Sequence, residues 1–286
     1  MIINLLFILL ELIFFYVIPF LFIFDFPKKC FNTISVKISI PLFLIATLLI
    51  FFPFFPFSIN NREVYNNISI GLGTNIYGLI ITIMFIQRIL DKHNLEKDIR
   101  EEKEKIIRLN SLVQISITDY ITSFQELTTP ISKTQSLNLN FSFEDIQDLY
   151  YSSLLITKLQ KSKIVVFYEN EKKLENDLLR MLSEINFFHY PKIRDIIISF
   201  IKEIKMNDVC EGIIANKKIT AGNKTLGDLA IEMIKDNKNQ NWITKFDNNQ
   251  LRGNIIVPYV VLYKSLHKQI SLIIDYQNLI KQISDY

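Results

Sequence analysis

Apolar residues are concentrated in three long runs within the first ninety positions of the chain. The runs cover residues 2–24, 38–57 and 68–87, and Glu11 is the only charged residue inside them. An α-helix rises about 1.5 Å per residue, so about twenty apolar residues cross a hydrocarbon core of about 30 Å. The pattern predicts a transmembrane region at residues 1–90, with spans at about 2–24, 36–57 and 67–89.

The segment after the third run is amphipathic and has the composition of a long helix. Residues 89–127 contain neither Pro nor Gly, and helix-forming Glu, Lys, Arg, Leu and Ile dominate within them. These features predict a stalk helix at residues 91–130. Its apolar positions recur with a heptad-like spacing, at Leu95, Ile99, Ile106, Leu109 and Val113. This seam fits a coiled coil, and an amphipathic helix that packs on its own domain fits equally well.

Beyond Pro130 the pattern keeps a helical period through most of the chain. Ser142 with Asp145, and Thr225 with Asp228, have the three-residue spacing of an N-terminal capping pair. The expected helices are 142–162 with a helical continuation to Ile185, then 191–204, 225–236 and the segment after Pro258. Residues 164–167 also fit a short strand, but the spacing that follows them favours a helix.

Two polar stretches separate the later helices. Residues 207–223 and 237–254 are rich in Gly, Asn and Lys, and Trp242 and Phe246 are expected to anchor the second one. No alternation of strand and helix patterns indicates a parallel sheet. The predicted fold class is all-α: a three-helix transmembrane region continues through the stalk helix into an all-helical cytoplasmic domain at residues 131–286.

Positive charge predicts the orientation of the spans. The first connection contains Lys28, Lys29 and Lys37, and many basic residues follow the third run, whereas the second connection contains only Arg62. Lys and Arg accumulate on the cytoplasmic side of membranes. We therefore expect an outside N-terminus and a cytoplasmic C-terminal domain. The residues expected at lipid headgroups are Lys28, Lys29, Arg88 and Lys92.

Polar groups inside the apolar runs are the first candidates for function. Glu11 is costly in lipid unless it faces another helix or water. The third run places small and polar residues at spacings of four, three and four: Gly71, Asn75, Gly78 and Thr82. Such a face permits close approach of a second helix, so we expect Glu11 to pack near Asn75 and Gly78. The alternatives are a purely structural Glu11, an ion or proton role, and exposure through a shifted first helix.

The composition and motifs argue against several classes of function. Residues 91–286 contain 27 Lys and Arg against 26 Asp and Glu, which leaves no basic excess for nucleic acid. Cys30 and Cys210 form no metal or redox pair, and the three histidines are far apart. The Gly-rich and Gly-Asn-Lys-Thr segments miss the spacings of dinucleotide and phosphate loops. We expect no cofactor, no metal site and no catalytic motif.

The leading hypothesis is a membrane-anchored sensor or effector that binds a cytoplasmic protein partner and forms a homo-oligomer through its transmembrane and stalk helices. The composition and layout, typical of an AT-rich genome and of small multi-pass proteins, place it in a bacterial inner membrane. One alternative is a static membrane scaffold. Another is an oligomeric channel or transporter subunit in which Glu11 contacts the permeating species. An enzyme in the helical domain is the least favoured class, because no motif supports it.

Overall fold

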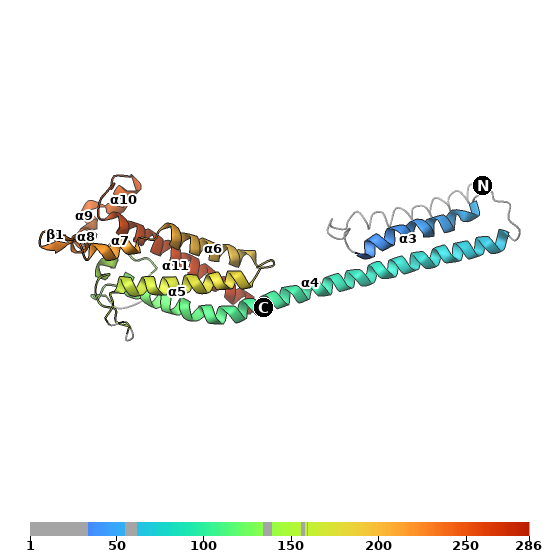
Figure 1. The fold of residues 1–286 in the computed structure, drawn as a ribbon, viewed down its shortest axis with the longest axis horizontal. Helices are drawn as coiled ribbons and strands as arrows, with labels where there is room; N and C mark the ends of the chain where they lie inside the picture. The colour runs from blue at the N-terminus through green and yellow to red at the C-terminus, as the bar shows by residue number, and fades with distance from the viewer. Residues whose placement is uncertain (1–33, 55–61, 134–138, 156–157, 159, 286) are drawn as a thin grey trace. The chain divides into compact units, whose positions relative to one another are not determined.

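A computed structural model describes residues 34–54, 62–133, 139–155, 158 and 160–285 of the chain (Figure 1). The chain divides into two compact units, Met1–Asp98 and Ile99–Tyr286. Within the described ranges the secondary structure is almost entirely helical, and the strands are limited to one antiparallel pair of two residues each. The predicted all-α class is confirmed.

The N-terminal unit contains α3 (Ile34–Phe51), the short 3₁₀ helix η3 (Phe52–Phe54) and the first part of α4 (Arg62–Thr128). Among the described residues, α4 is the one helix long and apolar enough to cross a membrane, and only 22% of its most apolar window is buried. The apolar helical stretch Pro41–Phe54 is shorter. The described residues therefore contain one candidate span rather than a three-helix region.

Several predictions fall on residues that the structure does not describe. The first expected span, at residues 2–24, lies entirely outside the described residues, and Glu11, Lys28 and Lys29 lie there with it. The expected contact between Glu11 and the third apolar run therefore stays a prediction.

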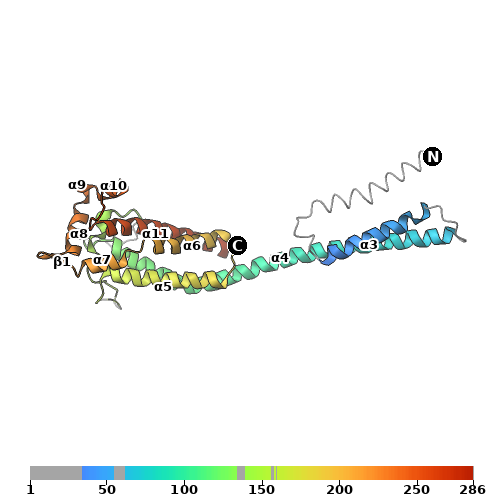
Figure 2. The ribbon, with the colours of Figure 1, turned by 45° about the horizontal axis from the view of Figure 1, so that its top comes forward.

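The C-terminal unit is built mainly from long helices that run side by side. Figures 1 and 2 both show α5 beside the last part of α4, and α6 beside α11. The helices are α5 (Lys163–Glu184), α6 (Pro191–Met206), α7 (Cys210–Asn216), α8 (Leu226–Lys235), α9 (Asn237–Gln240), α10 (Trp242–Asp247) and α11 (Val257–Ser284), with the 3₁₀ helix η4 (Phe143–Asp148) and the strands β1 (Thr220–Ala221) and β2 (Lys224–Thr225).

One contiguous hydrophobic core holds this unit together. The last part of α4 supplies a stripe of fully buried side chains at helical spacing, which includes Ile117, Tyr120 and Phe124. The apolar stripe predicted after Pro258 is buried on α11 as expected. Burial of large side chains stabilises the unit by about 1.5–3 kcal/mol each relative to exposure.

Capping residues and prolines determine where the helices of this unit begin and end. The helix α4 ends at Thr128, just before Pro130, because a proline restricts the residue that precedes it. The helix α8 begins after Thr225, whose hydroxyl accepts the Asp228 backbone N–H at 3.1 Å. The predictions of α5, α6, α8 and α11 are confirmed.

The helix expected at residues 142–162 is wrong. The 3₁₀ helix η4 covers Phe143–Asp148 in place of an α-helix, and an isolated bridge then joins Ser152 to Ser162. The backbone N–H groups of Lys163 and Ile164 donate to the carbonyls of Tyr151 and Leu149, so the loop returns to the start of α5. Tertiary hydrogen bonds therefore replace the helical ones.

The two polar stretches contain more structure than predicted. The first one includes α7 and the β1–β2 hairpin, whose turn places Gly222 at φ +66°, a conformation that favours glycine. The second one contains α9 and α10. Trp242 is buried as expected, and its indole N–H donates to the Met233 carbonyl at 2.8 Å.

Candidate functional site

The helices α3 and α4 of the N-terminal unit contact each other through an interface of polar and small residues. The Thr47 and Tyr77 hydroxyl oxygens lie 2.7 Å apart, and the Phe43 and Tyr77 rings meet edge to face at 5.3 Å. A Cβ at Gly73 would lie 2.9 Å from the Ala46 carbonyl oxygen. Glycine is therefore the residue that permits this close approach.

The predicted small-residue face of α4 points away from this interface. A Cβ at Gly71 or at Gly78 would meet no described atom within 4 Å, and Asn75 and Thr82 are exposed. At 3.6 residues per turn these four positions lie away from Gly73. The Thr82 hydroxyl donates to the Gly78 carbonyl at 2.8 Å, within its own helix. Among the described residues, nothing packs on this face.

The residues expected at lipid headgroups are exposed where they are described. Arg88 and Lys92 both lie on the surface of α4, and the Lys92 ammonium is 3.9 Å from the Glu96 carboxylate one turn away. An exposed pair of this kind contributes at most a few tenths of a kcal/mol, roughly 0.3–0.5. The Lys92 side chain is thus close to solvent and can reach a headgroup without breaking a strong contact.

The five heptad-like apolar positions of the predicted stalk helix lie in two different environments. Ile106, Leu109 and Val113 are buried in the core of the C-terminal unit, whereas Leu95 is 51% exposed and Ile99 is intermediate. The three buried positions therefore do not face a second copy of the chain. The coiled-coil interpretation is corrected to the alternative, an amphipathic helix packed on its own domain, because the domain core competes for the same apolar face.

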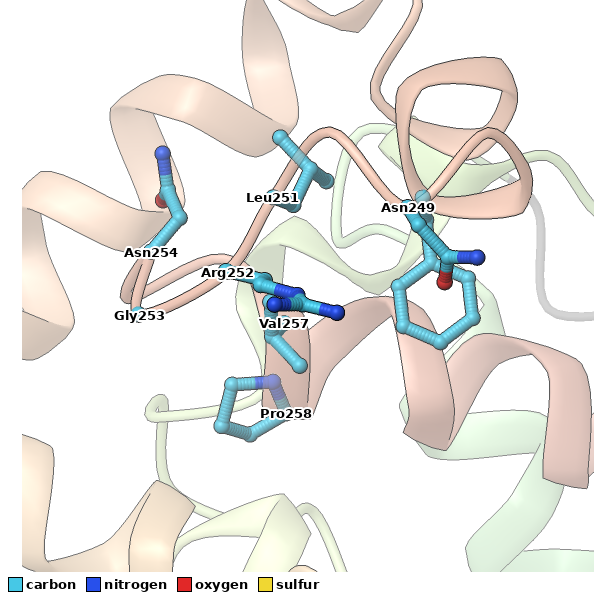
Figure 3. Close-up of a pocket in the computed structure, with 8 residues that line it drawn as sticks. Asn249, Leu251, Arg252, Gly253, Asn254, Val257 and Pro258 are labelled. Carbon is cyan, nitrogen blue, oxygen red and sulfur yellow. The ribbon is translucent and has the colours of Figure 1, made fainter.

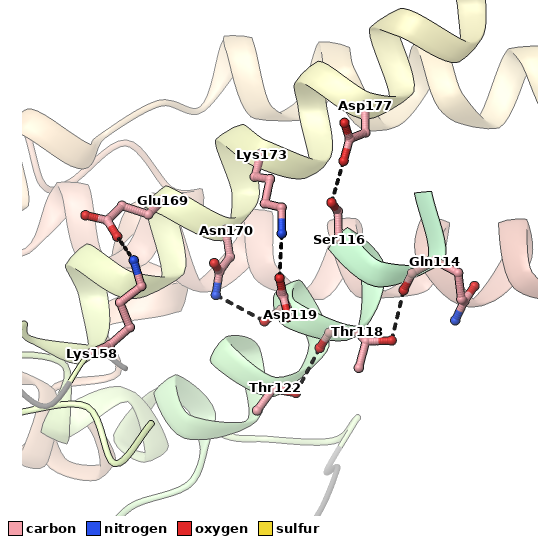
Figure 4. Close-up of polar contacts among 10 residues, drawn as sticks. All are labelled: Gln114, Ser116, Thr118, Asp119, Thr122, Lys158, Glu169, Asn170, Lys173 and Asp177. Atoms are coloured by element: carbon pink, nitrogen blue, oxygen red, sulfur yellow. Dashed lines mark hydrogen bonds and ion pairs between the residues drawn. The ribbon is translucent and has the colours of Figure 1, made fainter. Parts of the chain in front are cut away.

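Polar side chains connect α4 to α5 along the surface edge of this core (Figure 4). The Lys173 ammonium donates to the Asp119 carboxylate at 2.8 Å, and the Asn170 amide donates to the Asp119 carbonyl at 3.2 Å. The Ser116 hydroxyl donates to the Asp177 carboxylate. Together these bonds fix the position of α5 against α4.

A hydrogen-bond chain crosses the interior of the C-terminal unit and joins three helices. The Tyr120 hydroxyl on α4 donates to the Gln269 amide oxygen on α11 at 2.7 Å. The Gln269 amide nitrogen donates to the Glu171 carboxylate on α5 at 2.7 Å and lies 3.1 Å from the Ser265 hydroxyl. Tyr120, Gln269 and Glu171 are all buried.

Acidic and phenolic groups surround the Glu171 end of this chain. Burial raises the pKa of Glu171 to about 7, and the neighbouring Asp208 and Glu175 carboxylates oppose its ionisation as well. Burial also raises the pKa of the Cys210 thiol to about 11 and that of Tyr168. The Tyr168 hydroxyl is buried and makes no hydrogen bond to the described residues. This arrangement favours neutral, protonated groups.

A second buried polar cluster holds the loop that precedes α5. The Glu126 carboxylate on α4 accepts the Ser153 hydroxyl at 2.6 Å and the Leu154 backbone N–H at 2.7 Å. The Asp148 carboxylate accepts the Ile131 backbone N–H at 2.8 Å. Burial lowers the pKa of Lys163, and the Asp148 and Glu126 charges counteract that effect. These hydrogen bonds have a structural role, because both carboxylates accept them from residues of the loop.

Two surface hollows of the unit are shallow. One of about 410 Å³ lies beside the loop between α10 and α11, with an apolar floor that includes Leu251, Val257 and Pro258 and with Arg252 across it (Figure 3). A second of about 440 Å³ lies between α6 and α11. Both have the size of small-molecule sites, but neither encloses a ligand or gathers perturbed titratable groups.

No metal-binding cluster is found among the described residues. No group of three or more His, Cys, Asp and Glu side chains there is arranged to hold a metal ion. His93 is exposed, His189 lies 3.9 Å from Glu102, and His267 stacks on Phe141 at 4.0 Å. The three histidines therefore occupy separate environments.

No protein-family model matches this chain, and no curated protein or solved structure shows significant similarity to it.

The sequence reasoning missed the buried chain of Tyr120, Gln269 and Glu171. A signal was present, because Glu171 interrupts the apolar stripe formed by Phe167, Leu174 and Leu178 on α5. Gln269 likewise falls beside Leu266 and Ile270 on the buried side of α11. A polar residue on a core-facing stripe requires a partner, but periodicity alone does not name it.

Proposed function

We propose that the protein is a membrane-anchored sensor or effector whose helical C-terminal domain binds a cytoplasmic protein partner. The observation that carries the proposal is the continuity of α4, which supplies the exposed apolar segment of one unit and a central core helix of the other. A rigid displacement or rotation of this helix would act directly on the domain core. A flexible linker would not have this property.

The proposed membrane region has three spans, at about 2–24, 36–57 and 67–89, in a bacterial inner membrane. The exposed apolar side chains of α4 support it, because Ile81 and Phe85 are 67% and 65% exposed and large apolar surfaces of this kind are costly in water. The distribution of Lys and Arg supports an outside N-terminus and a cytoplasmic C-terminal domain.

The proposal includes self-association, but through fewer residues than the sequence predicted. The buried seam positions no longer support pairing through the stalk. The open face of Gly71, Asn75, Gly78 and Thr82 remains suited to close packing with a second α4 or with the first apolar run. Mass photometry of the full chain in detergent is expected to show dimers or larger species, and monomers alone at working concentration would contradict this part.

Protease protection tests the anchoring and the orientation together. In inverted inner-membrane vesicles, added protease is expected to degrade the C-terminal unit and to leave a protected fragment from residues 1–90. In right-side-out vesicles the C-terminal unit is expected to stay intact. Recovery of the full chain in the soluble fraction without detergent, or degradation in right-side-out vesicles, would overturn the proposal.

Replacement of residues 1–90 by an unrelated single-span anchor separates the sensor from a static scaffold. A scaffold requires only attachment, so its partner binding would survive the replacement unchanged. A sensor that works through α4 is expected to lose both the oligomer and the control of partner binding. The channel alternative predicts instead a conductance that changes with Glu11→Gln.

A further inference from the structure

The strongest unexplained feature of the C-terminal unit is a carboxyl group buried without a cation. Glu171 is only 6% exposed, and no Lys, Arg or His side chain among the described residues forms an ion pair with it. The nearby Glu175 carboxylate has its own partner, Lys205, at 3.4 Å. A buried carboxylate without a cation is strongly disfavoured relative to its neutral acid.

Among the described groups that face Glu171, the Gln269 amide favours a negative charge by donating a hydrogen bond, but no cation compensates it. Its own helix α5 presents Tyr168, Glu175 and, toward Cys210, Lys172. The other elements present Tyr120 on α4, the amide of Gln269 and the Ser265 hydroxyl on α11, and Asp208 and Cys210 around the start of α7. Ionisation therefore places a charge among acids and phenols.

The hydrogen-bond geometry gives this ionisation a route to α4. Gln269 donates to Glu171 with its amide nitrogen and accepts from Tyr120 with its amide oxygen, at 2.7 Å in each case. An added charge on Glu171 strengthens the first bond and polarises the second, because linked hydrogen bonds in a low-dielectric interior respond together. Burial outweighs this gain, since the pKa of Glu171 is raised overall, so ionisation is a net cost to the packing around it. Tyr120 lies on the helix that also forms the exposed apolar segment.

We propose that Glu171 is a proton-binding switch in the C-terminal core, and that the ionisation state of its carboxyl group is passed to α4 through Gln269 and Tyr120. At low pH the neutral acid packs within the three helices. As pH rises, loss of the proton introduces an uncompensated charge and loosens the packing of α5 against α4 and α11. The switch resides in the C-terminal unit and does not depend on the membrane topology.

The sign of the pH effect follows from the raised pKa. Burial raises the pKa of Glu171 from 4.5 to about 7, so the folded state binds this proton more tightly than the unfolded state. The stabilisation is full at pH values below the unfolded pKa and is lost as pH rises through the folded one. Between pH 5 and 8 this single group is expected to raise the unfolding equilibrium constant on the order of 100-fold.

The first experiment compares unfolding of the full chain and of Glu171→Gln in detergent between pH 5 and 8.5, followed by the fluorescence of Trp242. The unfolding equilibrium constant of the variant is expected to lack the rise of about 100-fold between pH 5 and 8. At pH 5 the two proteins are expected to have similar unfolding equilibrium constants. Glu184→Gln, on the same helix but in an exposed ion pair with Arg180, is the matched control and is expected to keep the wild-type profile. Parallel profiles for wild type and Glu171→Gln would overturn the proposal.

Infrared difference spectroscopy tests the titration itself. The wild-type chain is expected to show a protonated carboxyl C=O band that disappears as pH is raised through neutrality, and Glu171→Gln is expected to lack it. This measurement reports the protonation of the carboxyl group directly, so it is valid even if the variant changes stability for another reason. Absence of the band near neutral pH in the wild type would overturn the proposal.

Hydrogen exchange tests the coupling to α4. At pH 8 the amides around Tyr120 are expected to exchange faster in the wild type than in Glu171→Gln, with no difference at pH 5.5. In a Tyr120→Phe background the difference is expected to remain in α5 and α11 and to vanish in α4. A difference in α4 that persists without the Tyr120 hydroxyl would reject the proposed route.

Discussion

Apolar side chains are exposed on the first part of α4 and buried on its last part. In the N-terminal unit Leu72, Leu79 and Phe85 are 51%, 53% and 65% exposed. In the C-terminal unit Ile117 and Phe124 are completely buried. Because both parts belong to one uninterrupted helix, neither helix propensity nor local geometry accounts for the difference.

The difference in burial depends on what covers the apolar side chains of each part. The C-terminal unit provides its own apolar environment through α5, α6 and α11. The exposed apolar surface of the N-terminal unit has no such cover among the described residues apart from α3, and the proposed lipid environment would remove its cost. Substitutions at matched positions along this single helix can therefore distinguish the two kinds of cover.

The largest effect is expected from removing a ring from the core part of α4. Phe124→Ala is expected to lower the free energy of unfolding of the C-terminal unit by about 3–5 kcal/mol, since it leaves a cavity beside Phe141. Phe85→Ala is the matched control and is expected to change it by less than about 0.5 kcal/mol. Chemical unfolding of the full chain in detergent, followed by Trp242 fluorescence, measures both. Equal losses would refute the division of α4.

A charge scan with two equally exposed leucines tests the medium directly. Leu79 and Leu112 are 53% and 54% exposed on the same helix. Leu79→Lys is expected to oppose membrane insertion by about 2.5–3.5 kcal/mol, because Leu79 lies near the middle of the third apolar run. Leu112→Lys is expected to have no effect. The fraction of protein that resists alkaline extraction from membranes distinguishes the two, and indistinguishable fractions would contradict a lipid-facing α4.

The parts of this fold that could be predicted are those that depend on local repetition. The spacing of apolar residues was sufficient for α5, α6 and α11, and the Thr225–Asp228 pair was sufficient for the start of α8. Ser142 and Asp145 form a similar capping pair, but it starts only the short 3₁₀ helix η4, and Glu126 from a distant helix then binds Ser153 and Leu154. Local spacing contains no information about such a partner.

The candidate sites show the same limit. Periodicity correctly marked Ile106, Leu109 and Val113 as one apolar face, but it could not say whether a second chain or the domain core covers that face. Tyr120, Glu171 and Gln269 come from helices far apart in the sequence, so their contact depends on tertiary packing. Only the polar interruptions of two core-facing stripes hinted at a buried network.

The smallest of these effects is expected at the glycines of the N-terminal unit. A Cβ on Gly73 would lie 2.6 Å from Ile50 Cγ1 and 2.9 Å from the Ala46 carbonyl oxygen, whereas a Cβ on Gly78 would meet nothing within 4 Å. Gly73→Ala is therefore expected to weaken the contact between α3 and α4 by about 1–3 kcal/mol relative to Gly78→Ala, since both gain the same helix propensity.

The rate of thiol labelling at Thr47→Cys, in a background with Cys30 and Cys210 replaced by serine, measures this contact. Thr47 lies against Tyr77 across the two helices, so its labelling reports separation of α3 from α4. Gly73→Ala is expected to raise the rate about tenfold, because about 1.4 kcal/mol corresponds to a factor of ten. The same increase for Gly78→Ala would mean that α3 packs on the opposite face of α4. The small-residue face would then be occupied within one chain and would no longer be open to a second copy.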